Sequence, residues 1–253
     1  MSFDFKPDED DPMLAPVVAA VYAEPKYGKT SAVAHACPNH YWITTNPGAL
    51  RPVAAKAKST KLPTHKTILE FDSSGELFDT LGWLKAFCAT WIAGCKAGTT
   101  KSAGVVIDEY STVLARIFAQ LQTMNGTSGR GPFKTIDDLK NFNRFVCALP
   151  RVTGKGLVLI SHSQDPKFDD EEASPTRGKL RTPGGPKVPV QTMVREILQE
   201  MDAVVQISIV GGKRCLLVDP EPSWIRGIRG YNGPGKVEGT DLRALLESAG
   251  FQL

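Results

Sequence analysis

The chain has 253 residues, of which 42% are hydrophobic and 23% are charged, the balance of an ordinary globular protein with one large or two small domains. No apolar run approaches the roughly 18 residues of a membrane span. The acidic N-terminus lacks the apolar core of a signal peptide, so we expect a cytoplasmic protein with no membrane partner. The net charge of +3 excludes a polycation, and five scattered cysteines without a C-x-x-C pair indicate free thiols.

The first half of the chain alternates strands with helices. Residues 1–12 contain four consecutive acids beside prolines, which predicts a disordered tail before a single domain over residues 13–253. Apolar runs and apolar residues at helical spacing then predict, in chain order, a buried strand over 14–23, a helix that ends at Pro38, a strand over 40–46, a short helix within 47–58, a strand over 66–73 and a helix over 74–98.

The second half continues this alternation. The predicted elements are a strand over 103–111, a helix over 112–124, a glycine-rich loop over 125–134, a helix over 136–150 that stops at Pro150, a strand over 156–164, a loop over 165–190, a helix over 193–201, two strands joined by a Gly-Gly turn within 202–221, and a closing helix over 241–250. Strands that alternate with helices predict an α/β fold with a mostly parallel sheet between helices. The Gly-Gly turn adds an antiparallel hairpin at one edge of the sheet.

Residues 21–33, VYAEPKYGKTSAV, contain most of a phosphate-binding loop. Gly28, Lys29 and Thr30 match the end of the pattern G-x-x-x-x-G-K-[ST], whereas Ala23 replaces its first glycine, which is tolerable if φ is negative there. In such a loop, amides at a helix N-terminus surround the phosphates, the lysine reaches the β- and γ-phosphates, and the threonine ligates Mg²⁺. Lys26 either adds a charge near the phosphates or faces solvent. The residues predicted to hold ATP are Glu24, Pro25, Lys26, Tyr27, Gly28, Lys29, Thr30 and Ser31.

Polar residues follow two later apolar strands. Asp108 and Glu109 come directly after the run VVI, and in an open α/β sheet that end of a strand faces the ligand. Asp108 is therefore a candidate Mg²⁺ ligand with Thr30, and Glu109 is a candidate for polarising the attacking water. The alternative is a pair of surface acids that begin a helix. Ser161 and His162 are candidates for sensing the γ-phosphate, unless His162 caps the next loop.

Taken together, these motifs resemble a known family. The segments YAEPKYGKT, VVIDEYS, LISHSQ and WIRGIRGYNGPG occur in an order and spacing similar to the RecA-like P-loop ATPases, in particular the phage-encoded RecA-like single-strand annealing and AAA-type ATP-binding proteins. The resemblance covers roughly residues 14–250. It implies a RecA-type core, ATP with Mg²⁺, single-stranded DNA as a partner, and assembly into a ring or filament. A single-strand-binding protein or a nuclease would be a further partner, and the location would be a host cell's cytoplasm if the chain is phage-encoded.

The resemblance also assigns roles to residues outside the phosphate loop. Arg229, and after it Arg226, match a late basic motif in which an arginine reaches the γ-phosphate of a neighbouring subunit, and the alternative is a surface arginine beside a glycine-rich turn. Loops 125–134 and 165–190 stand where the family carries two DNA-binding loops, although a charged loop can equally be only solvated. The residues that would contact DNA are Arg130, Lys134, Arg177, Lys179, Arg181 and Lys187, with Phe133 and Phe168 available for base stacking.

One departure from the family concerns hydrolysis. RecA-like enzymes carry a catalytic glutamate where this chain has Asn46, which can orient a water but cannot accept its proton. Either Glu109 takes over that role or hydrolysis is slow. We therefore expect an ATP-binding, DNA-binding protein of recombination or strand annealing that hydrolyses ATP. The alternatives are a P-loop ATPase that remodels or packages through a protein partner, and a nucleotide-dependent switch with little hydrolysis.

Overall fold

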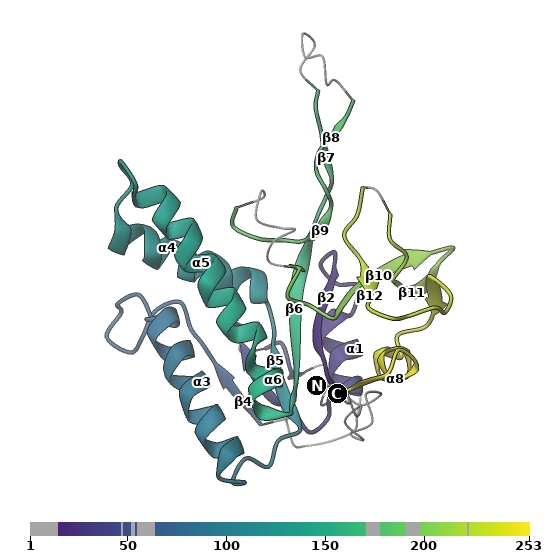
Figure 1. The fold of residues 1–253 in the computed structure, drawn as a ribbon, viewed down its shortest axis with the longest axis horizontal. Helices are drawn as coiled ribbons and strands as arrows, with labels where there is room; N and C mark the ends of the chain where they lie inside the picture. The colour runs from purple at the N-terminus through teal and green to yellow at the C-terminus, as the bar shows by residue number, and fades with distance from the viewer. Residues whose placement is uncertain are drawn as a thin grey trace, which may run out of the picture.

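A central sheet with helices on both faces forms the body of the molecule (Figure 1). The computed structural model describes residues 15–46, 48–51, 54, 64–170, 178–190, 198–221 and 223–253. Within these residues the sheet has ten strands, which lie in the spatial order β13 (Lys236–Glu238), β11 (Lys213–Leu217), β10 (Ala203–Val210), β2 (Val18–Ala23), β6 (Gly156–Gln164), β5 (Gly104–Ile107), β3 (Tyr41–Thr44) and β4 (His65–Thr67), with β12 (Gly227–Ile228) beside β10 and β9 (Gly185–Pro186) beside β6.

The helices divide between the two faces of the sheet. Those on one face are α3 (Thr80–Lys96), α4 (Tyr110–Asn125), α5 (Gly131–Cys147) and α6 (Leu149–Thr153), and those on the other are α1 (Lys29–Ala36) and α8 (Leu242–Ser248). Two pairs of short strands lie outside the main sheet, namely β1 (Ala15–Pro16) with β14 (Phe251–Gln252) and β7 (Lys167–Phe168) with β8 (Leu180–Thr182).

The direction of the strands matches the sequence prediction. The six neighbouring strands from β10 to β4 are parallel, whereas β11 pairs antiparallel with both β10 and β13. Gly211 and Gly212 form the turn between β10 and β11, and both have the positive φ that a two-residue hairpin requires. The predicted α/β fold with a mostly parallel sheet and an antiparallel edge hairpin is therefore confirmed.

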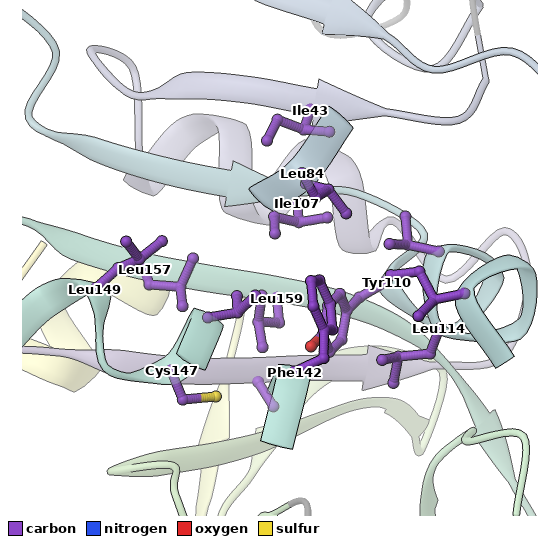
Figure 2. Packing of buried hydrophobic residues seen from close by; sticks show 14 of the residues in the cluster. Ile43, Leu84, Ile107, Tyr110, Leu114, Phe142, Cys147, Leu149, Leu157 and Leu159 are labelled. Atoms are coloured by element: carbon purple, nitrogen blue, oxygen red, sulfur yellow. The ribbon is translucent and has the colours of Figure 1, made fainter. Parts of the chain in front are cut away.

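Side chains that alternate along each strand build two separate cores. In β2, Val18 and Tyr22 belong to the core under α3–α6, whereas Ala19 and Val21 belong to the core under α1 and α8. Figure 2 shows the first core, where strand residues such as Ile107 meet side chains of α3, α4 and α5. Because both faces are covered, the central strands β2 and β5 are apolar throughout, which is the pattern that made them visible in the sequence.

The region predicted as a strand over 66–73 is different. The strand is limited to His65–Thr67, and farther along the chain the Asp72 carboxylate accepts the backbone N–H of Ser74 at 2.8 Å in a turn. The helix that follows begins at Thr80 rather than at residue 74, and its N-cap Asp79 accepts the N–H of Gly82 at 2.9 Å.

Other boundaries also needed correction. The glycine-rich loop spans only residues 126–130, because α5 begins at Gly131 with a proline in its first turn. Pro150 begins the short α6 instead of stopping a helix, since a proline in the first turn loses no intrahelical hydrogen bond. In the segment 165–190, described residues form the β7–β8 ribbon and β9, so the prediction of a plain loop was wrong there.

Some predictions fall on residues outside the described ranges. These are the tail over 1–12, most of the short helix within 47–58, most of the helix over 193–201, and Arg177. The strand over 156–164 coincides with β6, and the closing helix corresponds to α8.

Candidate nucleotide-binding site

Parallel strands bring the sequence motifs to one edge of the sheet. β2 ends at Ala23, directly before the phosphate loop, and β5 ends at Ile107, directly before Asp108. β6 lies between these two strands, with Ser161 opposite Tyr22 in the register. The carboxyl ends of parallel strands are where α/β sheets bind ligands, so this edge is the candidate site.

The phosphate loop has the backbone that its sequence predicts. Gly28 is the N-cap of α1 with φ of 86°, a left-handed conformation that glycine adopts without strain. Among the described non-glycine residues, positive φ occurs at Lys26 and Glu109, so Ala23 meets the condition under which alanine can replace the pattern's first glycine. Lys26 and Glu24 are exposed, whereas Tyr27 and Ser31 are half-buried.

Lys29 is a buried ammonium group at the mouth of this loop. Its Nζ donates to the carbonyl oxygens of Ala23 and Glu24, both at 3.0 Å. Burial lowers the pKa of Lys29, while the nearby acids, Asp108 first among them, act in the opposite direction. A buried cation held by neutral carbonyls can exchange them for an anion, because a charge-assisted hydrogen bond to phosphate is stronger.

Thr30 and Asp108 form an oxygen-rich pair beside Lys29. The Thr30 hydroxyl donates to the two oxygens of the Asp108 carboxylate at 3.3 and 3.4 Å, and Asp108 is only 2% exposed. Burial, and then the Glu109 carboxylate, raise the pKa of Asp108 to about 6. Hydroxyl and carboxylate oxygens are ligands that Mg²⁺ prefers, so these two residues fit a magnesium ion.

Glu109 follows in a strained backbone conformation. Its φ of 57° is left-handed, which costs a non-glycine residue of this kind on the order of 1 kcal/mol or more. Although Glu109 is the N-cap of α4, its side chain makes no capping hydrogen bond and instead accepts one from the Thr45 hydroxyl. The alternative that Asp108 and Glu109 are ordinary surface acids at a helix start therefore does not describe this geometry.

Asn46 is engaged elsewhere. Its exposed side chain accepts the backbone N–H of Gly48 at 2.9 Å within a turn. The neighbouring Thr45, which the sequence interpretation did not single out, is the residue that reaches Glu109. Its position directly after β3 was the available signal, because β3 and β5 are adjacent parallel strands.

Ser161 and His162 lie within β6 and not in a loop. Ser161 is buried, and the backbone N–H of His162 donates to the Ser111 hydroxyl at 3.4 Å. Burial, and then the Lys29 charge, lower the pKa of His162, which favours the neutral form of its ring. Nδ1 of this ring is buried and has no hydrogen-bond partner among the described residues.

A comparison with known families agrees with this geometry. A family model described as an AAA domain matches residues 15–230, which is most of the chain. The chain belongs to this AAA-domain family. It is thus an AAA-type, ATP-binding P-loop ATPase domain, and a search of curated proteins found no match. Across the ranges that the structure describes, none of the helices has the length and apolar composition that crossing a membrane requires.

The two arginines of the late basic motif occupy different surroundings in the AAA domain. Arg226 is enclosed, since its guanidinium donates to the Asp219 carbonyl at 2.7 Å, to Gln206 Oε1 at 2.6 Å and to the Glu221 carboxylate. Arg229 is more accessible, with a 56% exposed side chain that lies 3.4 Å from a carboxylate oxygen of Asp202.

Arg229 lies near the amino ends of the parallel strands, whereas the phosphate loop lies at their carboxyl ends. Asp202 also accepts the backbone N–H of Val18, the first residue of β2, at 3.0 Å. The length of β2 therefore separates Arg229 from the loop that follows Ala23, roughly 17 Å at 3.3 Å per residue. Within one subunit, Arg229 does not belong to the nucleotide site.

Four of the candidate DNA-binding residues lie on two projections, and Lys187 lies elsewhere. Arg130 is exposed at the N-cap of α5, and Lys134 lies in its first turn, where Nζ donates to Asn125 Oδ1 at 2.7 Å. Lys179 and Arg181 are exposed on the β7–β8 ribbon, which stands away from the body in Figure 1. Lys187 is exposed directly after β9.

Sequence reasoning missed a further cation at the nucleotide site. Arg214 of β11 packs against Gly28, because a methyl group placed on Gly28 would lie 3.3 Å from Cζ and Nη1 of the guanidinium. The sequence held a signal for this position. β10 is parallel to β2 and ends near the phosphate loop, so an antiparallel strand that follows it through a two-residue turn must begin there, and Arg214 is the second residue of that strand.

Proposed function

We propose that this AAA domain hydrolyses ATP at the edge formed by β2, β5 and β6 and uses the nucleotide to control its binding to single-stranded DNA. The observation that supports hydrolysis is the meeting of Lys29, Thr30, Asp108 and Glu109 at that edge. The role in phage-type recombination or strand annealing is what the resemblance of the sequence motifs implies.

Each residue of the site has a distinct task in this proposal. Lys29 exchanges its two carbonyl partners for phosphate oxygens, and the amides at the start of α1 point at the same anion. Thr30 and Asp108 would hold Mg²⁺, which neutralises charge on the phosphates. The Glu109 carboxylate orients the attacking water and accepts its proton. The His162 ring can donate a hydrogen bond toward the γ-phosphate.

Calorimetry with ATP and Mg²⁺ tests the nucleotide site. Lys29→Ala should weaken ATP binding by at least about tenfold, because it removes a charge-assisted contact, and should abolish phosphate release. Lys101→Ala is the control, since this exposed lysine lies just before β5, at the opposite edge of the sheet. Absence of binding heat from the unmodified protein at millimolar ATP would refute the nucleotide site itself.

Two projections support the DNA part of the proposal. The first turn of α5 presents Phe133, which is 72% exposed, beside Lys134 and the N-cap residue Arg130. The β7–β8 ribbon presents Phe168, which is 49% exposed, beside Lys179 and Arg181. Both projections extend beyond the sheet at the same end of the molecule (Figure 1). Exposed aromatic rings next to cations are the combination that binds single strands by base stacking and phosphate contact.

Fluorescence anisotropy of a labelled thymidine oligonucleotide, with and without ATP, tests this surface. A double change of Phe133 and Lys134 to alanine should weaken ATP-dependent binding by about tenfold, the size of one lost stacking contact and one phosphate contact. Lys85→Ala is a matched control, because Lys85 is exposed on α3 away from both projections. No binding by the unmodified protein at low salt would instead favour a protein partner for this ATPase.

A further inference from the structure

The position of Arg214 is determined by the edge hairpin. Arg214 of β11 lies opposite Ile209 of β10. Ile209 is three residues beyond Gln206, which is the last residue of β10 that pairs with β2. The hairpin therefore extends past the end of β2 and carries Arg214 to the edge where the phosphate loop begins. The backbone carbonyl of Arg214 accepts the N–H of Gly239 at 2.8 Å, so β11 is hydrogen-bonded both to β10 and to the segment around β13.

The side chain of Arg214 faces the same side of the sheet as α1. Side chains two residues apart share a face, and Leu216 belongs to the core that includes Ala32 and Val33 of α1. The guanidinium accordingly rests on Gly28, the N-cap of α1, with Cζ and Nη1 at 3.3 Å from the place of a Cβ on that glycine.

A cation at this place is electrostatically unfavourable without an anion. The N-terminus of a helix carries partial positive charge, which repels a guanidinium, and the Lys29 ammonium follows directly after Gly28 in sequence. Within the described part of the chain, the Arg214 side chain has no hydrogen bond or ion pair, whereas the adjacent Lys213 pairs with Glu238 at 2.9 Å. The arrangement has the positive groups of an anion site, and no carboxylate of the described residues pairs with Arg214.

We propose that Arg214 is a nucleotide-binding residue that contacts the phosphates of ATP from within the same subunit. This inference rests on the proposed nucleotide site and adds to it a ligand from a different element of the fold. Arginine suits the role because its planar fork remains charged and donates to two phosphate oxygens at once. Unlike Lys29, Arg214 has no partner among the described residues that it would have to release, and unlike Arg229, it needs no neighbouring subunit.

Titration of a fluorescent ATP analogue compares three variants. We expect Arg214→Ala to weaken nucleotide binding by about tenfold, the effect of one lost charge-assisted contact. Arg214→Lys should recover part of the affinity, because it keeps the charge and loses the fork. Lys213→Ala is the matched control, since it removes the same charge one residue away, and it should remain within about twofold of the unmodified protein.

Competition with inorganic triphosphate separates phosphate contact from contact with the base. Arg214→Ala should weaken triphosphate competition as much as it weakens ATP binding. Unchanged triphosphate competition would overturn the proposal, as would an Arg214→Ala protein that binds ATP normally while Lys29→Ala does not. That second result would leave the nucleotide site intact, whereas failure of the unmodified protein to bind ATP would refute both.

Discussion

At the scale of single residues, the nucleotide site places catalytic chemistry where folding would prefer neutral groups. Asp108 is a buried carboxylate whose pKa is raised to about 6, and Glu109 holds a left-handed backbone conformation. Both features destabilise the protein when no ligand is bound, and both suit a site where a cation and a phosphate supply the missing charge. The residues proposed to act on the nucleotide and its metal ion are thus also ones that the free protein accommodates at a cost in stability.

Replacing Asp108 by asparagine should stabilise the free protein in a pH-dependent manner. The folded state binds the Asp108 proton more tightly than the unfolded chain does, so the stability from this group is present at low pH and lost as the pH rises through 6. At pH 7.5 the Asn variant should gain up to about 3 kcal/mol in urea unfolding without Mg²⁺, at 1.36 kcal/mol per pKa unit.

The gain should shrink between pH 6 and pH 4, where the wild-type carboxyl is protonated. Asp137→Asn, on the exposed face of α5, is the control and should stay within about 0.5 kcal/mol at both pH values. An equal gain at pH 7.5 and pH 4 would contradict the burial of a charged Asp108.

Replacing Glu109 by glutamine should separate catalysis from binding. The amide oxygen of glutamine can still accept the Thr45 hydroxyl, so the side chain keeps its position but cannot take a proton. Phosphate release should fall by roughly a hundredfold or more, in the range of general-base catalysis, while ATP affinity stays unchanged. A variant with near-normal turnover would show that another group accepts the proton.

At the scale of elements, the helical hairpin of α4 and α5 acts as a rigid support. The buried Tyr110 hydroxyl donates to Asn143 Oδ1 at 2.8 Å and joins the two helices at their base. At the other end, Asn125 Nδ2 donates to Asp138 Oδ2 at 2.9 Å and links the end of α4 to α5, whose first turn carries Phe133. A hydrogen-bonded tip keeps an exposed aromatic ring in place, which reduces the entropy lost when a base stacks on it.

The hydrogen bond at the base of this hairpin should be measurable as stability. Tyr110→Phe removes the hydroxyl and leaves a buried amide oxygen without this donor, which should cost about 1–3 kcal/mol in urea unfolding. Tyr231→Phe is a matched control, because its hydroxyl donates to the Pro234 carbonyl in an exposed bond of 3.3 Å and should matter little. Equal effects of the two changes would argue against a structural role for the Tyr110 bond.

At the scale of the whole molecule, the phosphate loop and Arg229 lie at opposite ends of the parallel strands. The phosphate loop lies at the carboxyl ends of the strands and Arg229 lies near their amino ends, so Arg229 could act only on a γ-phosphate bound by a neighbouring subunit. An assembly that repeats head to tail places the amino ends of one subunit's strands against the carboxyl ends of the next subunit's strands, which is the geometry of rings and filaments.

Mixing two inactive variants tests such a shared site. Arg229→Ala and Lys29→Ala should each lack phosphate release, and their mixture should regain part of it. The reason is that one kind of interface then combines an intact Lys29 with an intact Arg229. A mixture of Lys29→Ala with the double variant Lys29→Ala/Arg229→Ala should stay inactive, because none of its subunits has an intact Lys29. If the first mixture also stays inactive, the role of Arg229 in a shared site is not supported.

The fold class and the position of the candidate nucleotide site could be predicted from the sequence alone. The apolar strands 14–23 and 156–164, the segment GKT at 28–30 and the Gly-Gly turn are local patterns, and they were enough to predict the α/β class, the parallel sheet and the nucleotide edge. These features are readable because a strand buried on both faces and a turn with positive φ each restrict the residues that can occupy them.

Only the tertiary structure decided how distant elements meet. The contacts of Thr45 with Glu109 and of Arg214 with Gly28 depend on strand order and register, which bring together residues far apart in the chain. The placement of Arg229 away from the phosphate loop depends on them as well. A local sequence pattern carries no record of these distances, because they arise only when hydrogen bonding aligns the strands and fixes which residues share an edge.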